Sequence, residues 1–390
     1  MVRPSIIQYI TGKNEEIMMS VKNIYRIGFL FCLTAVVGLT ACSGDESASS
    51  SANRQLSLKF FAHQMDDVPI AQAPSRRSLP TGFEVYTPVA GTNIIGFIAP
   101  ETGTAVAARI FTLDQNQWKT NITIEDPDAN YYLYGFLPVG SETSTDISTS
   151  RIAGKEYKDG AKILINRIKS LTTQDPCVIV GVKKDAAGTA LINDIDIQPG
   201  QFQYQFNADP SNEYAYLLLD HVFGAYQYQI GVTESYSQLR KIKLKSVTLS
   251  TMDSKTVNAV VTLTANTTSP LTSVVCTPNN DTGSNTVTLY QTGANESDKL
   301  LTKEFENLAT CYAPAINQQL KLTAVYDVYD KSGNHLIREN CNAENIFTPI
   351  VQETDLKPGK RHTIRITVNP TYLYVLSDPD LDNPTITVNL

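Results

Sequence analysis

Short runs of apolar residues, many of them alternating with polar ones, follow one another along the chain after residue 80. The first series includes "FEVYTP", "NIIGFIA", "YYLYGFLP", "AKILINRI" and "PCVIVGV", which are bounded by Gly, Pro, Asn or Asp. Runs rich in β-branched and aromatic residues with such boundaries are typical of strands. The best candidate for a helical turn or two is "TESYSQLRK" at 233–241. The pattern therefore predicts an all-β fold.

A second series of strand-like runs starts near residue 214. It includes "YAYLLLDHVFGAYQYQIGV", "KIKLKSVTLS", "LKLTAVYDVYD" and "HTIRITVNP". Between the two series lies a cluster of turn-forming residues, "NADPSNEY" at 207–214, which we interpret as a domain boundary. Two series of strands without a long helix predict a pair of β-sandwich domains, at 78–212 and 213–390.

Two local patterns refine this prediction. In "KIKLKSVTLS", Ile242 and Leu244 have one parity and Val247 and Leu249 the other. A bulge near Ser246 is needed to keep all four on the core face. Each half also contains a Pro-Gly pair, at 199–200 and 358–359, which suits the central positions of a type II turn between strands.

The start of the chain has the features of an export signal. Lys22 and Arg26 precede the apolar stretch "IGFLFCLTAVVGL", which fits a signal-peptide core and is short for a membrane span. We expect translation to begin at Met18 or Met19, just before this charged start, and residues 1–41 to be removed.

The apolar stretch ends in "LTAC", which resembles the lipobox of bacterial lipoproteins, in which Cys42 would be acylated after cleavage. The alternative is an ordinary cleavage site beside an unmodified cysteine. The following "SGDE" resembles the acidic surface-export signal of Bacteroidales lipoproteins. Several acyl chains hold a protein stably on a membrane, so we expect attachment to the outer membrane at the cell surface.

The only Arg-Arg pair of the chain, Arg76-Arg77, lies in a linker rich in Pro, Ala and Asp between two strand-like runs. The run before it, "QLSLKFFA", alternates apolar and polar residues, and we predict one strand whose removal would follow cleavage at the pair. The strand that we expect to be removed includes Gln55, Leu56, Leu58, Phe60 and Ala62. The alternative is that the pair belongs to an inert solvated turn.

Loss of a strand from a sheet exposes unpaired N–H and C=O groups beside an apolar trough, and such an edge pairs readily with another strand. The C-terminal "LDNPTITVNL" is expected to supply a free alternating strand, made up of Thr385, Ile386, Thr387, Val388 and Leu390. Addition of this donor strand from one subunit to the next would be a head-to-tail contact, which builds open filaments.

Charge and composition exclude some classes of function. The 390 residues carry a net charge of −7, and no basic patch is interleaved with aromatic residues, so we expect no nucleic-acid partner. The four histidines show no metal-ligand spacing, and no catalytic motif occurs. "DPDLDN" at 378–383 lacks the glycine and the final glutamate of a calcium loop. We therefore expect no enzyme, no cofactor and no metal.

Four cysteines remain after the signal region and Cys42, and none forms a CxxC pair. The sequence leaves two alternatives: one disulfide among Cys276, Cys311 and Cys341, or buried thiols throughout. Cys177 is the least suited to a bridge. Glycan binding is a further alternative for a surface lipoprotein, since Trp118 and the 19 tyrosines offer aromatic rings, but the tyrosines fall mostly within strand runs, where packing explains them.

The segments "LTACSGDE", "SRRSLPTGFEVY", "YYLYGFLP", "TTQDPCVIVG", "LLLDHVFGAYQYQI" and "LKPGKRHTIRITVNPTYLYV" together resemble the fimbrillin family, lipoprotein precursors of Bacteroidales type V pili. This resemblance implies two tandem transthyretin-like β-sandwich domains. It also implies acylation at Cys42, cleavage by an Arg-specific protease at Arg76 or Arg77, and polymerisation by donor-strand exchange. Residues 42–77 would then be a lipidated propeptide that contains the removable first strand.

The resemblance makes other copies of the chain or related pilus subunits the expected partners, together with the protease and the outer membrane, which the lipid would engage before processing. The expected role is a structural fimbria subunit that supports adhesion to a surface receptor not identified by the sequence. The alternatives are a pilus anchor or tip component, and a surface glycan-binding lipoprotein.

Overall fold

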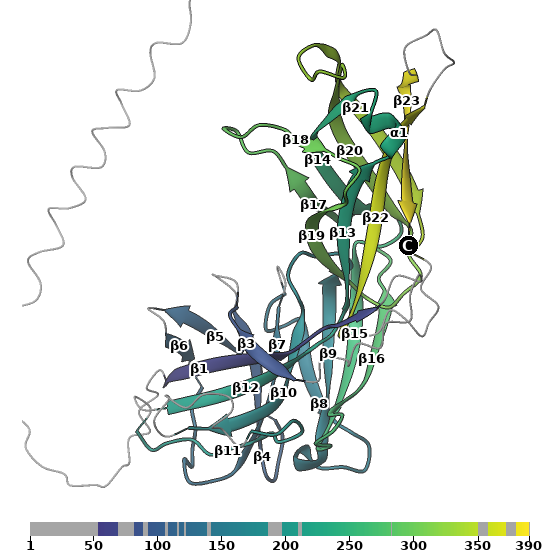
Figure 1. Cartoon of the computed structure of the whole chain (residues 1–390). Helices are drawn as coiled ribbons and strands as arrows, with labels where there is room; N and C mark the ends of the chain where they lie inside the picture. Colours follow the sequence, from purple (N-terminus) through teal and green to yellow (C-terminus); the bar gives the residue numbers. More distant parts are fainter. Residues whose placement is uncertain are drawn as a thin grey trace, which may run out of the picture. The chain divides into compact units, whose positions relative to one another are not determined.

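Four β-sheets make up the part of the chain that the computed structural model describes (Figure 1), namely residues 54–68, 82–88, 93–105, 108–114, 117–120, 122–138, 142–185, 197–209, 213–281, 283–349, 358–371 and 380–389. The predicted all-β class is confirmed. The only helical segments in these ranges are the 3-10 turn η1 (Tyr157–Asp159) and α1 (Glu234–Ser237), the latter inside the segment predicted to form a helical turn. No described helix is long and apolar enough to span a membrane.

Two of the sheets pack together and are called here the N-terminal sheet pair. The first has nine strands, in the order β10 (Cys177–Lys184), β12 (Glu213–His221), β1 (Arg54–His63), β6 (Gln117–Thr120), β5 (Arg109–Asp114), β4 (Ile94–Pro100), β7 (Tyr131–Leu137) and β11 (Gln203–Tyr204), with β3 (Phe83–Tyr86) also beside β1. The second has four, in the order β16 (Leu271–Pro278), β15 (Thr256–Thr264), β9 (Gly160–Lys169) and β8 (Ile147–Arg151).

The nine-stranded sheet closes on itself, because β10 pairs with β7 as well as with β12. One core cluster, which includes Trp118, Leu133 and Leu217, packs on one face of this closed sheet. A second cluster, which includes Phe97, Ile163 and Val261, fills the space between its other face and the four-stranded sheet. The strands of the closed sheet are therefore covered on both faces over much of their length.

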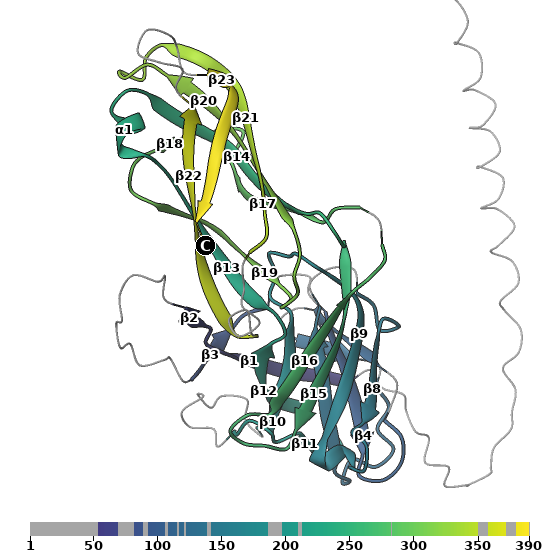
Figure 2. The same ribbon diagram turned by 90° about the vertical axis from the view of Figure 1, so that its right-hand side faces the viewer.

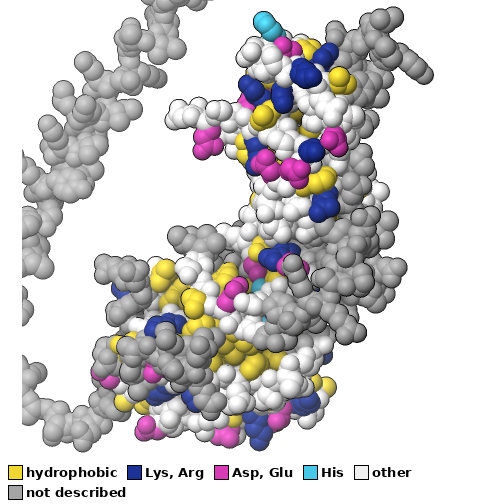
Figure 3. All heavy atoms as spheres, in the orientation of Figure 1, with side chains coloured by type: hydrophobic (Ala, Val, Ile, Leu, Met, Phe, Trp, Pro, Cys, Tyr) yellow, Lys and Arg dark blue, Asp and Glu magenta, His cyan; other side chains and the backbone are white. Residues whose placement is uncertain are grey.

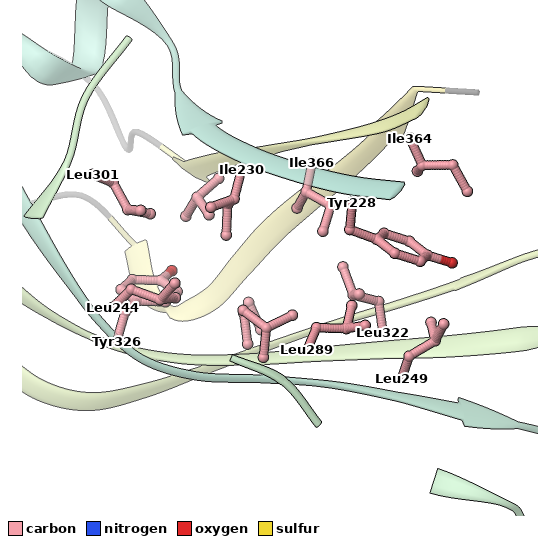
Figure 4. Packing of buried hydrophobic residues seen from close by; sticks show 14 of the residues in the cluster. Tyr228, Ile230, Leu244, Leu249, Leu289, Leu301, Leu322, Tyr326, Ile364 and Ile366 are labelled. Atoms are coloured by element: carbon pink, nitrogen blue, oxygen red, sulfur yellow. The ribbon is translucent and has the colours of Figure 1, made fainter. Parts of the chain in front are cut away.

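The remaining sheets form the C-terminal sheet pair. One contains β19 (Glu306–Ala313), β13 (Gly224–Val232), β22 (Lys360–Thr371) and β2 (Asp66–Val68), with β23 (Asp380–Asn389) also paired to β22. The other contains β17 (Thr286–Gln291), β14 (Lys241–Thr251), β20 (Leu320–Tyr329) and β21 (Leu336–Phe347), with β18 (Lys299–Leu301) also paired to β14. Figure 4 shows Tyr228, Ile230 and Ile366 of the first facing Leu244, Leu322 and Tyr326 of the second.

Both local patterns behave as the sequence predicts. The pairing of β14 with β20 shifts register between Leu244 and Ser246, and the bulge leaves Ile242, Leu244, Val247 and Leu249 all buried. At the Pro-Gly pairs, Gly200 has φ +80° and Gly359 has φ +77°. A positive φ at the third residue is what a type II turn requires, and glycine adopts it without strain.

Strand pairing crosses the boundary predicted at 207–214. β12 lies beyond that boundary, yet it pairs with β1 and β10 in the closed sheet, and β15 pairs with β9. Consecutive strands β12 and β13 therefore belong to different sheet pairs, as do β14 and β15. Hydrophobic alternation determines which face of a strand is buried but not which strand lies beside it, so the sequence pattern could not place these crossings.

None of the four described cysteines forms a disulfide, so no bridge links Cys276, Cys311 and Cys341. Cys177, Cys311 and Cys341 are buried within strands, which is the packing role that the sequence left open. Trp118 is also buried, with 3% of its surface exposed, and cannot serve as an exposed platform for a sugar ring.

Figure 3 shows hydrophobic side chains gathered over the nine-stranded sheet and charges of both signs interspersed over the C-terminal sheet pair on the face that is visible. Val85, on β3 beside β1, is the most exposed large hydrophobic residue in the described part of the chain, at 75%.

Candidate functional site

The first strand is built into the closed sheet rather than laid against it. β1 pairs in parallel with β12 from Leu56–Glu213 to Ala62–Leu219. Its other edge pairs antiparallel with β6 at Arg54–Leu56 and with β3 at Phe60–His63. We call the space between β12 on one side and β6 and β3 on the other the β1 slot. Figure 1 shows β1 beside β12 at this position.

Side chains of β1 enter both cores. Leu56, Phe60 and Ala62 are buried in the cluster that contains Trp118, and the Phe60 and Trp118 rings meet edge to face at 5.5 Å between centroids. Leu58 is partly buried against the same cluster. Phe61 points to the other core, where its ring stacks on Tyr216 at 5.9 Å. The alternation of the sequence correctly predicts the first face, but it did not single out Phe61 for the second.

The end of β1 is anchored by a buried histidine. His221 Nε2 lies 2.5 Å from the backbone oxygen of His63, and Nδ1 lies 2.6 Å from Asp175 Oδ2. Cys177 Sγ lies 3.9 Å from the same Nδ1. The carboxylate at hydrogen-bond distance from the imidazole belongs to Asp175, from the loop before β10, and not to the neighbouring Asp220.

Asp175, Cys177 and His221 are the one described group whose ligand atoms, all within 4.8 Å of one another, could hold a metal. Both imidazole nitrogens, however, lie at hydrogen-bond distance from oxygen acceptors, an arrangement that suits an imidazolium donating twice. Burial and the nearby carboxylates raise the pKa of the Cys177 thiol well above its ordinary value, so the sulfur is neutral. The cluster therefore acts as a charged anchor for the strand end.

The anchor gives the precursor a specific pH dependence. Burial alone would lower the pKa of His221, but the hydrogen bond and charge of Asp175 outweigh it and raise the pKa from 6.5 to about 9. A raised pKa stabilises the fold fully below pH 6.5, and this contribution is lost as the pH rises through about 9. We expect His221→Asn to remove most of this loss, seen as a smaller fall in urea midpoint between pH 6 and pH 10 than in the parent chain. Equal falls in both proteins would contradict the assignment.

A short strand follows β1 and lies within the segment that the sequence analysis treated as a linker between two strand-like runs. β2 pairs in parallel with the start of β22, from Asp66–Lys360 to Val68–His362. Asp66 Oδ2 lies 2.6 Å from Lys360 Nζ, and Asp67 binds Arg361 through Nε at 2.6 Å and Nη2 at 3.0 Å. The hydrogen bond with Asp67 raises the pKa of Arg361 further above its ordinary value. We call this segment the β2 clip.

The C-terminal strand pairs within its own chain, whereas the sequence predicted a free strand. β23 pairs antiparallel with β22 from Arg365–Asn389 to Asn369–Thr385 and again at Thr371–Asp380 (Figure 2). The alternating sequence of this segment suits a strand, and the edge of β22 lies within its reach. Unpaired backbone groups beside an open sheet edge are unfavourable, so the segment pairs there. Thr385, Ile386, Thr387 and Val388 fall within β23, and Val388 is partly buried against the core of the C-terminal sheet pair.

Several predicted positions lie outside the described residues: Cys42, Arg76, Arg77 and Leu390. Gln55 is described as part of β1 by its backbone. In the chain, the Arg pair falls between β2 and β3, so a cut there separates β1 and the β2 clip from all later strands.

No family model matches the sequence, and no curated protein matches it. Among solved structures, one similar chain is a proposed cell adhesion protein from Bacteroides fragilis, with TM-score 0.39, 10% identity, and coverage of 87% of this chain and 97% of that one. A fimbrial protein from Bacteroides vulgatus has TM-score 0.36, 14% identity, and coverage of 77% and 92%. The fimbrial anchor protein Mfa2 from Porphyromonas gingivalis has TM-score 0.26, 10% identity, and coverage of 87% and 98%.

Because all three TM-scores are below 0.5, the function proposed below depends on the sequence motifs and on the geometry of the β1 slot.

Proposed function

We propose that the chain is the precursor of a structural pilus subunit that is exported as a lipoprotein, cut at Arg76 or Arg77, and polymerised by donor-strand exchange. The observation that carries the proposal is the position of β1, an integral strand of a closed sheet that precedes the Arg pair in the chain. Cleavage leaves β1 and the β2 clip attached only by non-covalent contacts. Processing thus breaks the covalent link between β1 and the later strands, so that another strand can replace β1.

Departure of β1 opens the closed sheet at one place. It exposes the backbone groups of β12 on one side and of β6 and β3 on the other, together with the apolar contacts of Trp118 and Tyr216. Backbone pairing and pockets for alternate side chains are the means by which a foreign strand adds to a sheet. The slot is therefore suited to an extended strand with apolar residues at every second position.

The strand from Thr385 to Leu390 fits this requirement, with Ile386, Val388 and Leu390 on one face. β23 pairs with one strand, β22, whereas β1 has paired strands along both of its edges. β23 therefore loses fewer backbone pairs when it leaves its position. Each subunit would donate this strand to the β1 slot of the next copy. The repeated contact is head-to-tail and gives a filament.

In this proposal the acyl chains of Cys42 hold the precursor on the outer membrane until an Arg-specific protease releases the subunit into a fimbria at the cell surface. The two sheet pairs would be tandem transthyretin-like sandwiches, and the subunit supports adhesion without being an enzyme. A pilus anchor would instead keep the lipid, β1 and the β2 clip, and a tip component would not donate its C-terminal strand.

Substitution of both arginines, Arg76→Gln with Arg77→Gln, is expected to leave a folded precursor that an Arg-specific protease does not cut at this linker. The protein should remain monomeric, while the parent chain is cut and forms oligomers, as measured by intact mass and light scattering. Arg151→Gln serves as the control, because it removes an arginine outside the linker and leaves the Arg pair in place. A parent chain that is cut at the pair and stays monomeric would count against the proposal.

A further inference from the structure

The foot of β22, defined here as Lys360, Arg361 and His362, has a basic edge that β2 covers. Asp66 and Asp67 meet Lys360 and Arg361 with contacts of 2.6 Å each, and the Asp66 backbone N–H donates to the Gly359 oxygen at 2.8 Å. β2 precedes the Arg pair, so processing removes it together with β1. The foot then loses two carboxylates and its backbone partner at once.

Farther along the same edge, β22 is already paired with β23. β23 pairs with β22 only from Arg365 onward, so its contacts stop short of the foot. Among the groups that face Arg361 across space, Glu84 and Tyr312 remain after cleavage, whereas Asp67 departs. The processed subunit would therefore present a sheet edge with unpaired backbone groups and two adjacent cations, next to the end of the β1 slot.

We propose that the basic foot of β22 binds the acidic half of an incoming β23 from a second copy of the chain; this inference rests on the proposed function. The sequence of β23, "DLDNPTITVN", begins with Asp380 and Asp382 and continues, after Pro384, as the apolar half that the proposed exchange places in the β1 slot. The donor would thus replace both departing pieces, its acidic half standing in for the β2 clip and its apolar half for β1.

The order of the two halves sets the direction of the donor. In the precursor the apolar β1 comes first and the acidic β2 second, whereas in β23 the acidic residues come first. Matching both halves requires the donor to run opposite to β1. It would then lie antiparallel to β22, the pairing that β23 already makes with β22 in its own chain, whereas β2 is parallel. The stretch from Asp380 to the C-terminus is about as long as that from Leu56 to Asp67.

Opposite charges at the two surfaces increase association rates by about tenfold or more, and added salt weakens the effect. A different arrangement, in which the second copy takes over only the part of β22 from Arg365 onward, needs no cation at the foot. Dependence of assembly on the charges of Lys360 and Arg361 therefore separates the two arrangements.

The test uses the full-length precursor with the clip reversed as a pair: Asp66→Lys, Asp67→Lys, Lys360→Glu and Arg361→Glu. The reversed clip keeps opposite charges in contact, so the precursor should fold and be cut like the parent chain. After cleavage the foot is acidic and repels Asp380 and Asp382. We expect polymerisation at low salt to be at least about tenfold slower than for the parent, and addition of Asp380→Lys with Asp382→Lys to the same chain to restore it.

The matched control is Lys162→Glu with Lys331→Glu, two exposed positions away from β22 that give the processed subunit the same change in net charge; it should polymerise at the parental rate. Donor variants Asp380→Asn with Asp382→Asn, which leave the clip intact, should slow assembly and reduce its salt dependence. Parental rates in the reversed-clip and Asn variants would overturn this inference alone. Failure of the parent chain to polymerise after complete cleavage would overturn the proposed function itself.

Discussion

A chain that begins at Ser78, and so lacks β1 and the β2 clip, is expected to lose most of its folding stability. Leu56, Phe60 and Phe61 are at most 5% exposed, and burial of such side chains contributes about 1.5 to 3 kcal/mol each. Together with the lost backbone pairing, this is comparable with the whole stability of a typical domain, roughly 5 to 15 kcal/mol. The truncated chain should be largely unfolded or aggregated at low denaturant concentration.

Fluorescence of Trp118, the single tryptophan, measures this effect directly because its ring packs on Phe60 in the slot. Addition of a synthetic peptide covering residues 54–68 should restore a native-like spectrum and a cooperative urea transition, whereas a peptide of the same composition in scrambled order should not. A truncated chain that unfolds cooperatively at the parental urea midpoint would show that β1 is dispensable to the sheet.

Deletion of residues 385–390 is expected to abolish polymerisation of the processed subunit while leaving the precursor folded. In the described part of the chain β23 pairs with β22 alone in its sheet, but it also lies beside β21 and Val388 is partly buried against the core, so we expect the precursor to stay folded with reduced stability. The β1 slot of the truncated chain is unchanged, and it should still accept a strand. Light scattering after cleavage by an Arg-specific protease measures the loss.

The same truncated chain provides an internal control when it is mixed in small amounts with the parent chain. Because it accepts a donor but provides none, it should cap growing filaments and shorten them in electron micrographs. Parental amounts of fibre from the truncated chain alone would contradict the role of β23 as the donor.

Local structure follows closely from the sequence of this chain. The bulge in β14, the helical turn at Glu234–Ser237 and the positive φ of Gly200 and Gly359 each depend on a few neighbouring residues, whose parity or backbone freedom leaves little choice. The strand character of Leu56–Ala62 follows in the same way, since alternation marks its buried face.

Non-local pairing does not follow from the same patterns. β12 joins the closed sheet, and β15 joins β9, because apolar faces distant in sequence meet there, and alternation carries no information on partners. The β2 clip was missed because "DDV" is too short and too acidic to resemble a strand, and only Lys360 and Arg361, far along the chain, make it one. His221 likewise acquires Asp175 and the His63 oxygen from separate segments.

The most direct test of strand exchange is the mass and N-terminal sequence of the subunit in fibres recovered from the cell surface. The proposed processing predicts a first residue of Arg77 or Ser78 and the absence of any peptide from β1 or the β2 clip. Fibres whose subunits retain residues 54–63, either in the chain or bound as a cleaved fragment, would contradict it.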